Sequence, residues 1–137
     1  MTAVIKRGVV KGLTVTLELA KIVVPVYILV TFLKYTPVLG YIAKTAQPLM
    51  KLVGLPGEAS VAIVLGYFTN LYAAIGAIAS LNLSSKETTI IATMLLIAHS
   101  LPMETAVSKK VGVSGLAMVT IRVALSVAAG AVLNLVM

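Results

Sequence analysis

The stretch LPGEASV at residues 55–61 recurs as LPMETAV at residues 101–107, and these two stretches decide how the chain divides into helices. Each copy contains a proline, which lacks a backbone N–H and disfavours helical geometry in the residue before it. Two positions after the proline each copy carries a glutamate, Glu58 or Glu104, and the whole chain has only four acidic residues. The pattern predicts two breaks between helical segments, each with a carboxylate just after the break.

The composition is typical of an integral membrane protein. Hydrophobic residues make up 60% of the chain, charged residues make up 11%, and the mean hydropathy is +1.10. We therefore expect an all-α, polytopic helical membrane protein that forms a single membrane domain over residues 1–137. Windows that approach or exceed the roughly 20 residues needed to cross the hydrocarbon layer are predicted as full spans: Gly12–Leu33, Ala59–Leu81 and Val113–Met137.

The segments outside these windows are predicted to lie at the membrane surface or to enter it only part of the way. Residues 1–11 form a basic amphipathic lead-in, and residues 34–57 form an amphipathic or re-entrant helix. Ser84 or Ser85 is suited to cap a following helix that has Glu87 in its first turn.

A fourth apolar window, Thr88–Ser108, is interrupted by His99, Pro102 and Glu104. If it is a re-entrant hairpin, the basic residues outside the spans divide six to three: Lys6, Arg7, Lys11, Lys86, Lys109 and Lys110 against Lys34, Lys44 and Lys51. If Thr88–Ser108 crosses the membrane completely, the same basic residues divide four to five between the two sides. The hairpin therefore favours one orientation, with the N-terminus in the cytoplasm, although an even division is also typical of dual-topology proteins.

Several classes of function are excluded or disfavoured by the composition. The net charge is +7, but the basic residues flank apolar segments, which indicates contact with anionic lipid rather than nucleic acid. The absence of cysteine excludes disulfides and thiolate chemistry. One histidine and two glutamates without close spacing do not make a metal-ligand set, and no catalytic motif is present, so we expect neither a metal site nor an enzyme.

The candidate ligand-binding residues are polar groups in the breaks and in the uncharged window: Glu58, Glu104, His99, Ser100, Thr105 and Asn70. A glutamate in the first turn of a helix can simply stabilise that helix end. Two glutamates after matching breaks are also typical of the discontinuous helices that form transporter sites. His99 can either converge with Glu104 on a ligand or donate to a backbone carbonyl, and Arg122 can either extend toward the membrane surface or pair with a glutamate.

Four strings resemble the nucleoside-recognition, or Gate, domain family: KIVVP at 21–25, PLMKLVGLPGEA at 48–59, NLYAAI at 70–75 and HSLPMETAV at 99–107. The family includes the spore maturation proteins A and B, and related domains occur in concentrative nucleoside transporters and in the bacterial ferrous iron transporter. The resemblance implies re-entrant hairpins whose tips meet substrate near the membrane midplane. By motif, Glu58 and Glu104 are the nearest counterparts of the glutamates that bind nucleoside in those transporters.

These observations lead to two alternative functions. The first is a small transporter, or half of one, in the prokaryotic inner membrane, with a midplane site for a nucleoside-like solute and a proton or Na⁺ as the candidate coupling ion; it needs no cofactor. The second is a non-transporting scaffold or assembly subunit. Three spans provide few walls for a pathway, so we expect a homodimer or a paralogous partner, and the paired stretches suggest an inverted repeat.

Overall fold

The computed structural model describes residues 1–137, apart from the side chain of Thr2, and over these residues it contains seven helices and no strand. The helices are α1 (Thr2–Lys34), α2 (Pro37–Leu52), α3 (Ala59–Phe68), α4 (Leu71–Ser80), α5 (Ser85–Ile97), α6 (Leu101–Lys110) and α7 (Gly115–Val136). Three stretches are long and apolar enough to cross a membrane: Ala3–Lys34, Ser85–Lys110 and Gly115–Val136. The prediction of an all-α membrane protein with about three spans is confirmed.

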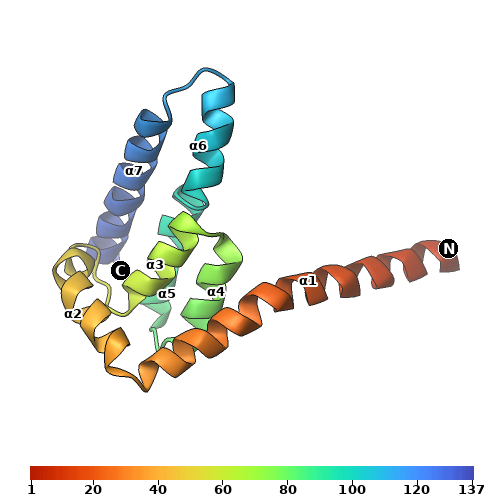
Figure 1. Cartoon of the computed structure of the whole chain (residues 1–137), viewed down its shortest axis with the longest axis horizontal. Helices are drawn as coiled ribbons and strands as arrows, with labels where there is room; N and C mark the ends of the chain where they lie inside the picture. The colour runs from red at the N-terminus through yellow and green to blue at the C-terminus, as the bar shows by residue number, and fades with distance from the viewer.

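The window Ala59–Leu81, predicted as a span, is instead a helical hairpin. Figure 1 shows α3 and α4 side by side and antiparallel, joined at Thr69 and Asn70. Asn70 is extended (φ −165°, ψ 166°), and its side chain accepts a hydrogen bond of 2.9 Å from the Ala73 N–H, which starts α4. Each helix has ten residues, a length of about 15 Å, or about half of a hydrocarbon layer.

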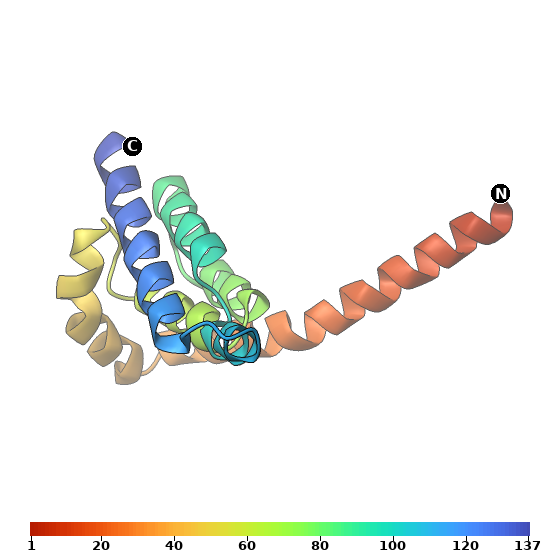
Figure 2. The ribbon, with the colours of Figure 1, turned by 90° about the horizontal axis from the view of Figure 1, so that it is seen from above.

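The window Thr88–Ser108, predicted as a hairpin, does not fold back on itself, because α5 and α6 do not pack on each other as the two arms of a hairpin would. Figure 2 shows α6 nearly end-on while α5 lies along the view, so the chain turns sharply between them, and α7 packs on both helices. Only Ala98, His99 and Ser100 separate α5 from α6. This short interruption redirects the chain without reversing it, because Pro102 lies in the first turn of α6, where a missing N–H costs nothing.

This exchange of hairpin and span removes the charge argument for a single orientation. With α3 and α4 returning to the side from which they start, the basic residues near the ends of the spans and in the segments between them divide five to four: Lys6, Arg7, Lys11, Lys109 and Lys110 against Lys34, Lys44, Lys51 and Lys86. The six-to-three division assumed a hairpin at Thr88–Ser108, and the structure does not contain that hairpin.

The predicted start of α5 is confirmed, and lysines stabilise two helix ends. Ser84 and Glu87 form a capping box, with Glu87 Oε2 2.7 Å from the Ser84 N–H. Lys34 Nζ donates to the last carbonyl of α4, and Lys86 Nζ donates to a carbonyl near the end of α7, both at 2.8 Å. Cations are favoured at these ends because helix C-termini carry partial negative charge.

The core lies where α3 and α5 pack closely. The largest fully buried side chains of α5 are Ile90, Ile91, Met94 and Leu95. Gly66 of α3 makes the contact possible, since a Cβ there would lie 2.3 Å from Leu95 Cδ2. This packing holds the end of α3 against the end of α5, and so fixes the relative position of the two helix interruptions.

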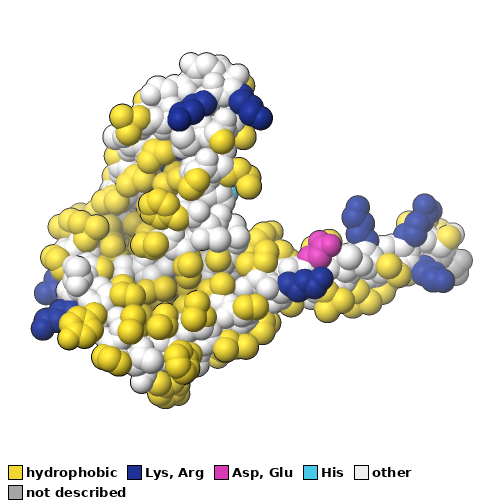
Figure 3. Space-filling view, viewed as in Figure 1, with side chains coloured by type: hydrophobic (Ala, Val, Ile, Leu, Met, Phe, Trp, Pro, Cys, Tyr) yellow, Lys and Arg dark blue, Asp and Glu magenta, His cyan; other side chains and the backbone are white. Residues whose placement is uncertain are grey.

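Helices α1 and α2 lie outside this core. Helix α2 lies within residues 34–57, where a membrane-surface or re-entrant helix was predicted. It packs on α1 and α3. The C-terminal half of α1 packs on α4, whereas its N-terminal half projects away from the body of the protein (Figures 1 and 2). Hydrophobic side chains cover much of the face in Figure 3, with Lys and Arg along the projecting part of α1, at the far end of α6 and at the edge formed by α2.

Candidate functional site at the helix breaks

Two helix interruptions meet in the structure. We call the place where they meet the helix-break junction; it comprises the end of the hairpin (Gly66–Asn70) and the interruption Ala98–Leu101. The Ser100 N–H donates to the Gly66 carbonyl at 2.9 Å, and the Ser100 hydroxyl lies 3.5 Å from the Thr69 carbonyl. Ser100 adopts the left-handed conformation (φ 48°, ψ 39°), which is uncommon outside glycine.

Four helix ends surround the junction, and Arg122 of α7 reaches two of them. The carboxyl ends of α3 and α5 carry partial negative charge, and the amino ends of α4 and α6 carry partial positive charge. Arg122 Nε donates to the Ile97 carbonyl at 2.8 Å, and its Nη1 forms an ion pair with the Glu104 carboxylate. The guanidinium therefore compensates the end of α5 and ties α6 to α7, which identifies Glu104 as the glutamate with which Arg122 pairs.

A second polar cluster links α3, α5 and α7, one helical turn beyond Arg122 along α7. The Tyr67 and Ser126 hydroxyls lie 2.5 Å apart, and the Ser126 hydroxyl donates to the Met94 carbonyl at 2.9 Å. Because the Ser126 hydroxyl donates its one proton to Met94, Tyr67 is the donor to Ser126, and the buried Ser126 side chain is fully paired. Sequence reasoning did not select Tyr67 or Ser126. One sequence signal could have indicated Ser126: it is four residues after Arg122, so both side chains lie on one face of α7.

The other predicted residues at the junction have individual roles. His99 Nδ1 lies 3.0 Å from the Leu95 carbonyl, so the backbone-bonded alternative describes this histidine. Asn70 caps α4. Thr105 is different, because its buried hydroxyl has no hydrogen-bond partner among the described residues.

Glu58 is the predicted residue that the structure does not bring to the junction. It is exposed and precedes α3, at the end of that helix opposite the hairpin turn. The ten residues of α3 separate it from the turn by about 15 Å. The structure thus separates the two glutamates that the repeated stretches led us to pair.

A groove of about 410 Å³ opens beside the junction. It is lined by Tyr67, Phe68, Leu101, Pro102, Thr105, Val119 and Val123, from α3, α6 and α7. Two aromatic side chains and Thr105 therefore line one apolar space, and the Thr105 hydroxyl itself is buried and unpaired next to it. Grooves with a few polar groups in an apolar lining are typical of small-molecule sites.

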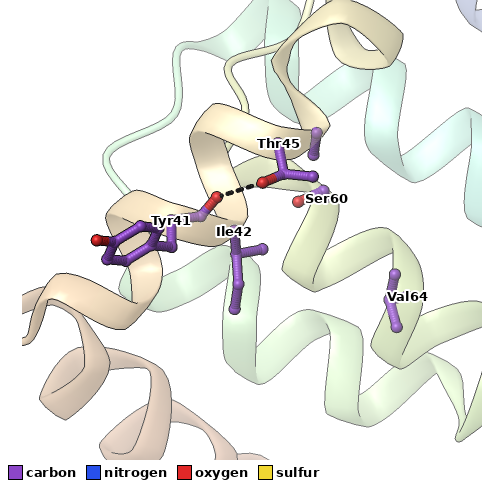
Figure 4. Close-up of a pocket in the computed structure, with 6 residues that line it drawn as sticks. Tyr41, Ile42, Thr45, Ser60 and Val64 are labelled. Atoms are coloured by element: carbon purple, nitrogen blue, oxygen red, sulfur yellow. Dashed lines mark hydrogen bonds between the residues drawn. The ribbon is translucent and has the colours of Figure 1, made fainter.

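A second groove, of about 420 Å³, lies between α2 and α3 (Figure 4) and has a different character. The Thr45 hydroxyl donates to the Tyr41 carbonyl at 2.9 Å, and the Ser60 hydroxyl donates to the Gly57 carbonyl at 2.7 Å. Its hydroxyls are thus already paired, and the remaining lining is the apolar side chains of Ile42, Ala46 and Val64 with the ring of Tyr41. This groove suits lipid chains better than a polar solute.

Comparison with known proteins assigns the family. The model of the Gate family, described as nucleoside recognition, matches residues 16–108. The chain belongs to this family. The match includes both helix interruptions and ends within α6, so Arg122 and Ser126 of α7 lie outside it.

One similar relative is also a membrane protein. The uncharacterized membrane protein YvoD of Bacillus subtilis (strain 168) is 39% identical over 136 residues, which is 99% of this chain and 44% of that protein. The chain therefore spans less than half the length of this relative. No solved structure matches the chain. Together with the three apolar stretches, the family and the relative identify a membrane protein.

Proposed function

We propose that this protein is a membrane transporter, or half of one, that binds a polar solute in the groove beside the helix-break junction. The observation that carries the proposal is the hydrogen bond from Ser100 to Gly66, which joins two interrupted helices at one place. Irregular backbone is tolerated inside a membrane where protein buries it or where it lines a cavity. Transporters with discontinuous helices place their substrate sites at such interruptions.

Nucleosides are the first class of solute to consider, because the family is described by nucleoside recognition. The groove offers groups that suit them. Tyr67 and Phe68 provide aromatic faces for a flat base, and Tyr67 is held in place by its bond to Ser126. The Thr105 hydroxyl is buried and unpaired beside the groove, and a rotation of its side chain would present it to a sugar or base.

Glu104 is the proposed link between solute and coupling ion. A carboxylate inside a membrane is costly unless it is paired, and here its partner is Arg122. A proton or Na⁺ that binds the carboxylate would weaken the ion pair and free the guanidinium. We propose the cytoplasmic membrane of a prokaryote as the location, with Lys6, Arg7 and Lys11 on the cytoplasmic side, since the first span usually sets orientation.

The test is uptake of radiolabelled adenosine, uridine and free nucleobases into proteoliposomes at several pH values and Na⁺ concentrations. We expect uptake by the wild type and its loss in Glu104→Gln. Glu58→Gln is the matched variant: equal loss in both would support the pairing predicted from sequence, whereas the structure predicts a loss only at Glu104. No uptake and no thermal stabilisation by any of these solutes would contradict the proposal.

The second candidate function is a non-transporting scaffold. It is favoured by the ion pair itself, because Glu104 with Arg122 at a helix junction is also what a purely structural contact requires. In that case Glu104→Gln would lower the stability of the protein without affecting the binding of any solute.

A further inference from the structure

Helix α2 presents three parallel rows of side chains, and each row forms one helix face because its members follow one another by alternating steps of four and three residues. The first row packs on the body of the protein. Leu39, Met50 and Val53, the last of them directly after the helix, are 3%, 6% and 2% exposed, and Ala43 and Ala46 between them are half-buried. This row fixes how the other two rows face outward.

The second row is exposed and almost entirely apolar. Its members are Val38, Ile42, Thr45, Leu49 and Leu52. The one hydroxyl among them donates to a backbone carbonyl of its own helix. In a membrane protein such a row is suited to contact hydrocarbon.

The third row is exposed and basic. Its members are Pro37, Tyr41, Lys44, Pro48 and Lys51. The chain has no acidic residue between Glu18 and Glu58, and neither lysine of this row forms an ion pair among the side chains that the structure describes. A basic row beside an apolar row, with an exposed tyrosine, is typical of a helix that lies at the membrane surface with its cations toward lipid phosphates.

Two grooves on α2 meet at Tyr41. The first, of about 380 Å³, is lined by Pro37, Gly40, Tyr41 and Lys44. The second is the apolar groove between α2 and α3, which Tyr41 lines together with Ile42 of α2 and Val64 of α3 (Figure 4). A groove with an unpaired cation therefore adjoins a groove with an apolar lining, and these are the surroundings that the two parts of an anionic phospholipid require.

We propose that α2 binds one anionic phospholipid, with its headgroup phosphate beside Lys44 and an acyl chain in the groove between α2 and α3. The ammonium of Lys44 attracts the phosphate, and the apolar groove holds the chain. A zwitterionic lipid fits the apolar groove equally well, but its choline brings a second cation toward the lysine. The site does not depend on which solute the helix-break junction binds.

Native mass spectrometry of the detergent-solubilised protein, titrated with phosphatidylglycerol or with phosphatidylcholine of the same acyl chains, tests the headgroup. We expect one phosphatidylglycerol to bind each chain more tightly than phosphatidylcholine does. Lys44→Gln should weaken phosphatidylglycerol binding about fivefold and leave phosphatidylcholine binding unchanged. Lys109→Gln, which removes an exposed cation from the last turn of α6, should change neither. Equal affinities of the wild type for the two lipids, or equal losses in the two lysine variants, would overturn the proposal.

A second pair of variants tests the acyl-chain groove. Val64→Trp fills this groove from an exposed position, and Val107→Trp adds the same side chain at a similarly exposed position of α6, outside both grooves. We expect Val64→Trp to weaken the binding of both lipids with unchanged helical circular dichroism, and Val107→Trp to bind them as the wild type does. Glycerophosphoglycerol, the same headgroup without acyl chains, should not displace phosphatidylglycerol at equal concentration. Displacement by this soluble phosphate, or wild-type affinity for phosphatidylglycerol in Val64→Trp, would refute the proposal.

Discussion

Replacing Arg122 with alanine is expected to destabilise the protein more than any other single change at the helix-break junction. The substitution leaves the Glu104 carboxylate without its cation and the Ile97 carbonyl without its donor. Breaking a fully buried ion pair costs about 3–5 kcal/mol. The Arg122 and Glu104 side chains are 21% and 28% exposed, so we expect a value near the lower end, about 3 kcal/mol.

A double-mutant cycle separates this ion pair from simple loss of packing. Glu104→Gln alone should cost about 1 kcal/mol, because the amide oxygen still accepts a hydrogen bond from the guanidinium. The double variant should cost about 1 kcal/mol less than the sum of the single variants, since it contains no unpaired carboxylate. The assay is reversible unfolding in mixed SDS micelles, followed by circular dichroism. Additive effects, or an Arg122→Ala variant as stable as the wild type, would refute the reasoning.

Three further changes test other contacts. Ser126→Ala should lower the free energy of unfolding by about 1–3 kcal/mol, because it leaves the buried Tyr67 hydroxyl unpaired; Tyr67→Phe in the same background should recover part of the loss. Asn70→Ala should cost about 1 kcal/mol and speed amide exchange in the hairpin turn, whereas Asn70→Asp should keep the cap. Gly57→Ala should prevent stable folding in the same unfolding assay, since its Cβ would lie 2.0 Å from a backbone oxygen of α2, whereas Gly40→Ala has open space and should be tolerated.

The sequence predicted the elements whose ends are determined by local chemistry. Ser84 with Glu87 starts α5 as expected, and α5 is interrupted just before Pro102. These signals act over three or four residues, so they can be read directly from the chain. The sequence also predicted that polar groups would gather at the second break, and Glu104 and Ser100 do lie there.

The exchange of hairpin and span could not be predicted from local signals. The window Ala59–Leu81 has no charge and no proline, and only Thr69 and Asn70 separate its two helices, so its hydropathy predicts one continuous span. The hairpin forms because α3 and α4 pack on each other and Gly66 fits against α5. Such contacts between distant segments are not visible in a hydropathy window.

The repeated stretches were a guide to breaks but not to a shared site. Pro56 lies in the loop before α3, whereas Pro102 is the second residue of α6. The first copy therefore places Glu58 at the end of the hairpin opposite its turn, and the second copy places Glu104 beside Arg122. Arg122 is 18 residues after Glu104 in the sequence, and only the packing of α7 on α6 brings the two together.

The most direct test of the central claim is the accessibility of Thr105 from water. A single cysteine at Thr105 lies in the groove beside the junction, and one at Thr45 lies in the apolar groove between α2 and α3. With a charged, membrane-impermeant thiosulfonate applied to proteoliposomes, we predict modification of Thr105→Cys, slowed by adenosine or uridine, and no modification of Thr45→Cys. Equal rates at the two positions, or a Thr105→Cys rate that no transported nucleoside changes, would contradict a solute site at the helix-break junction.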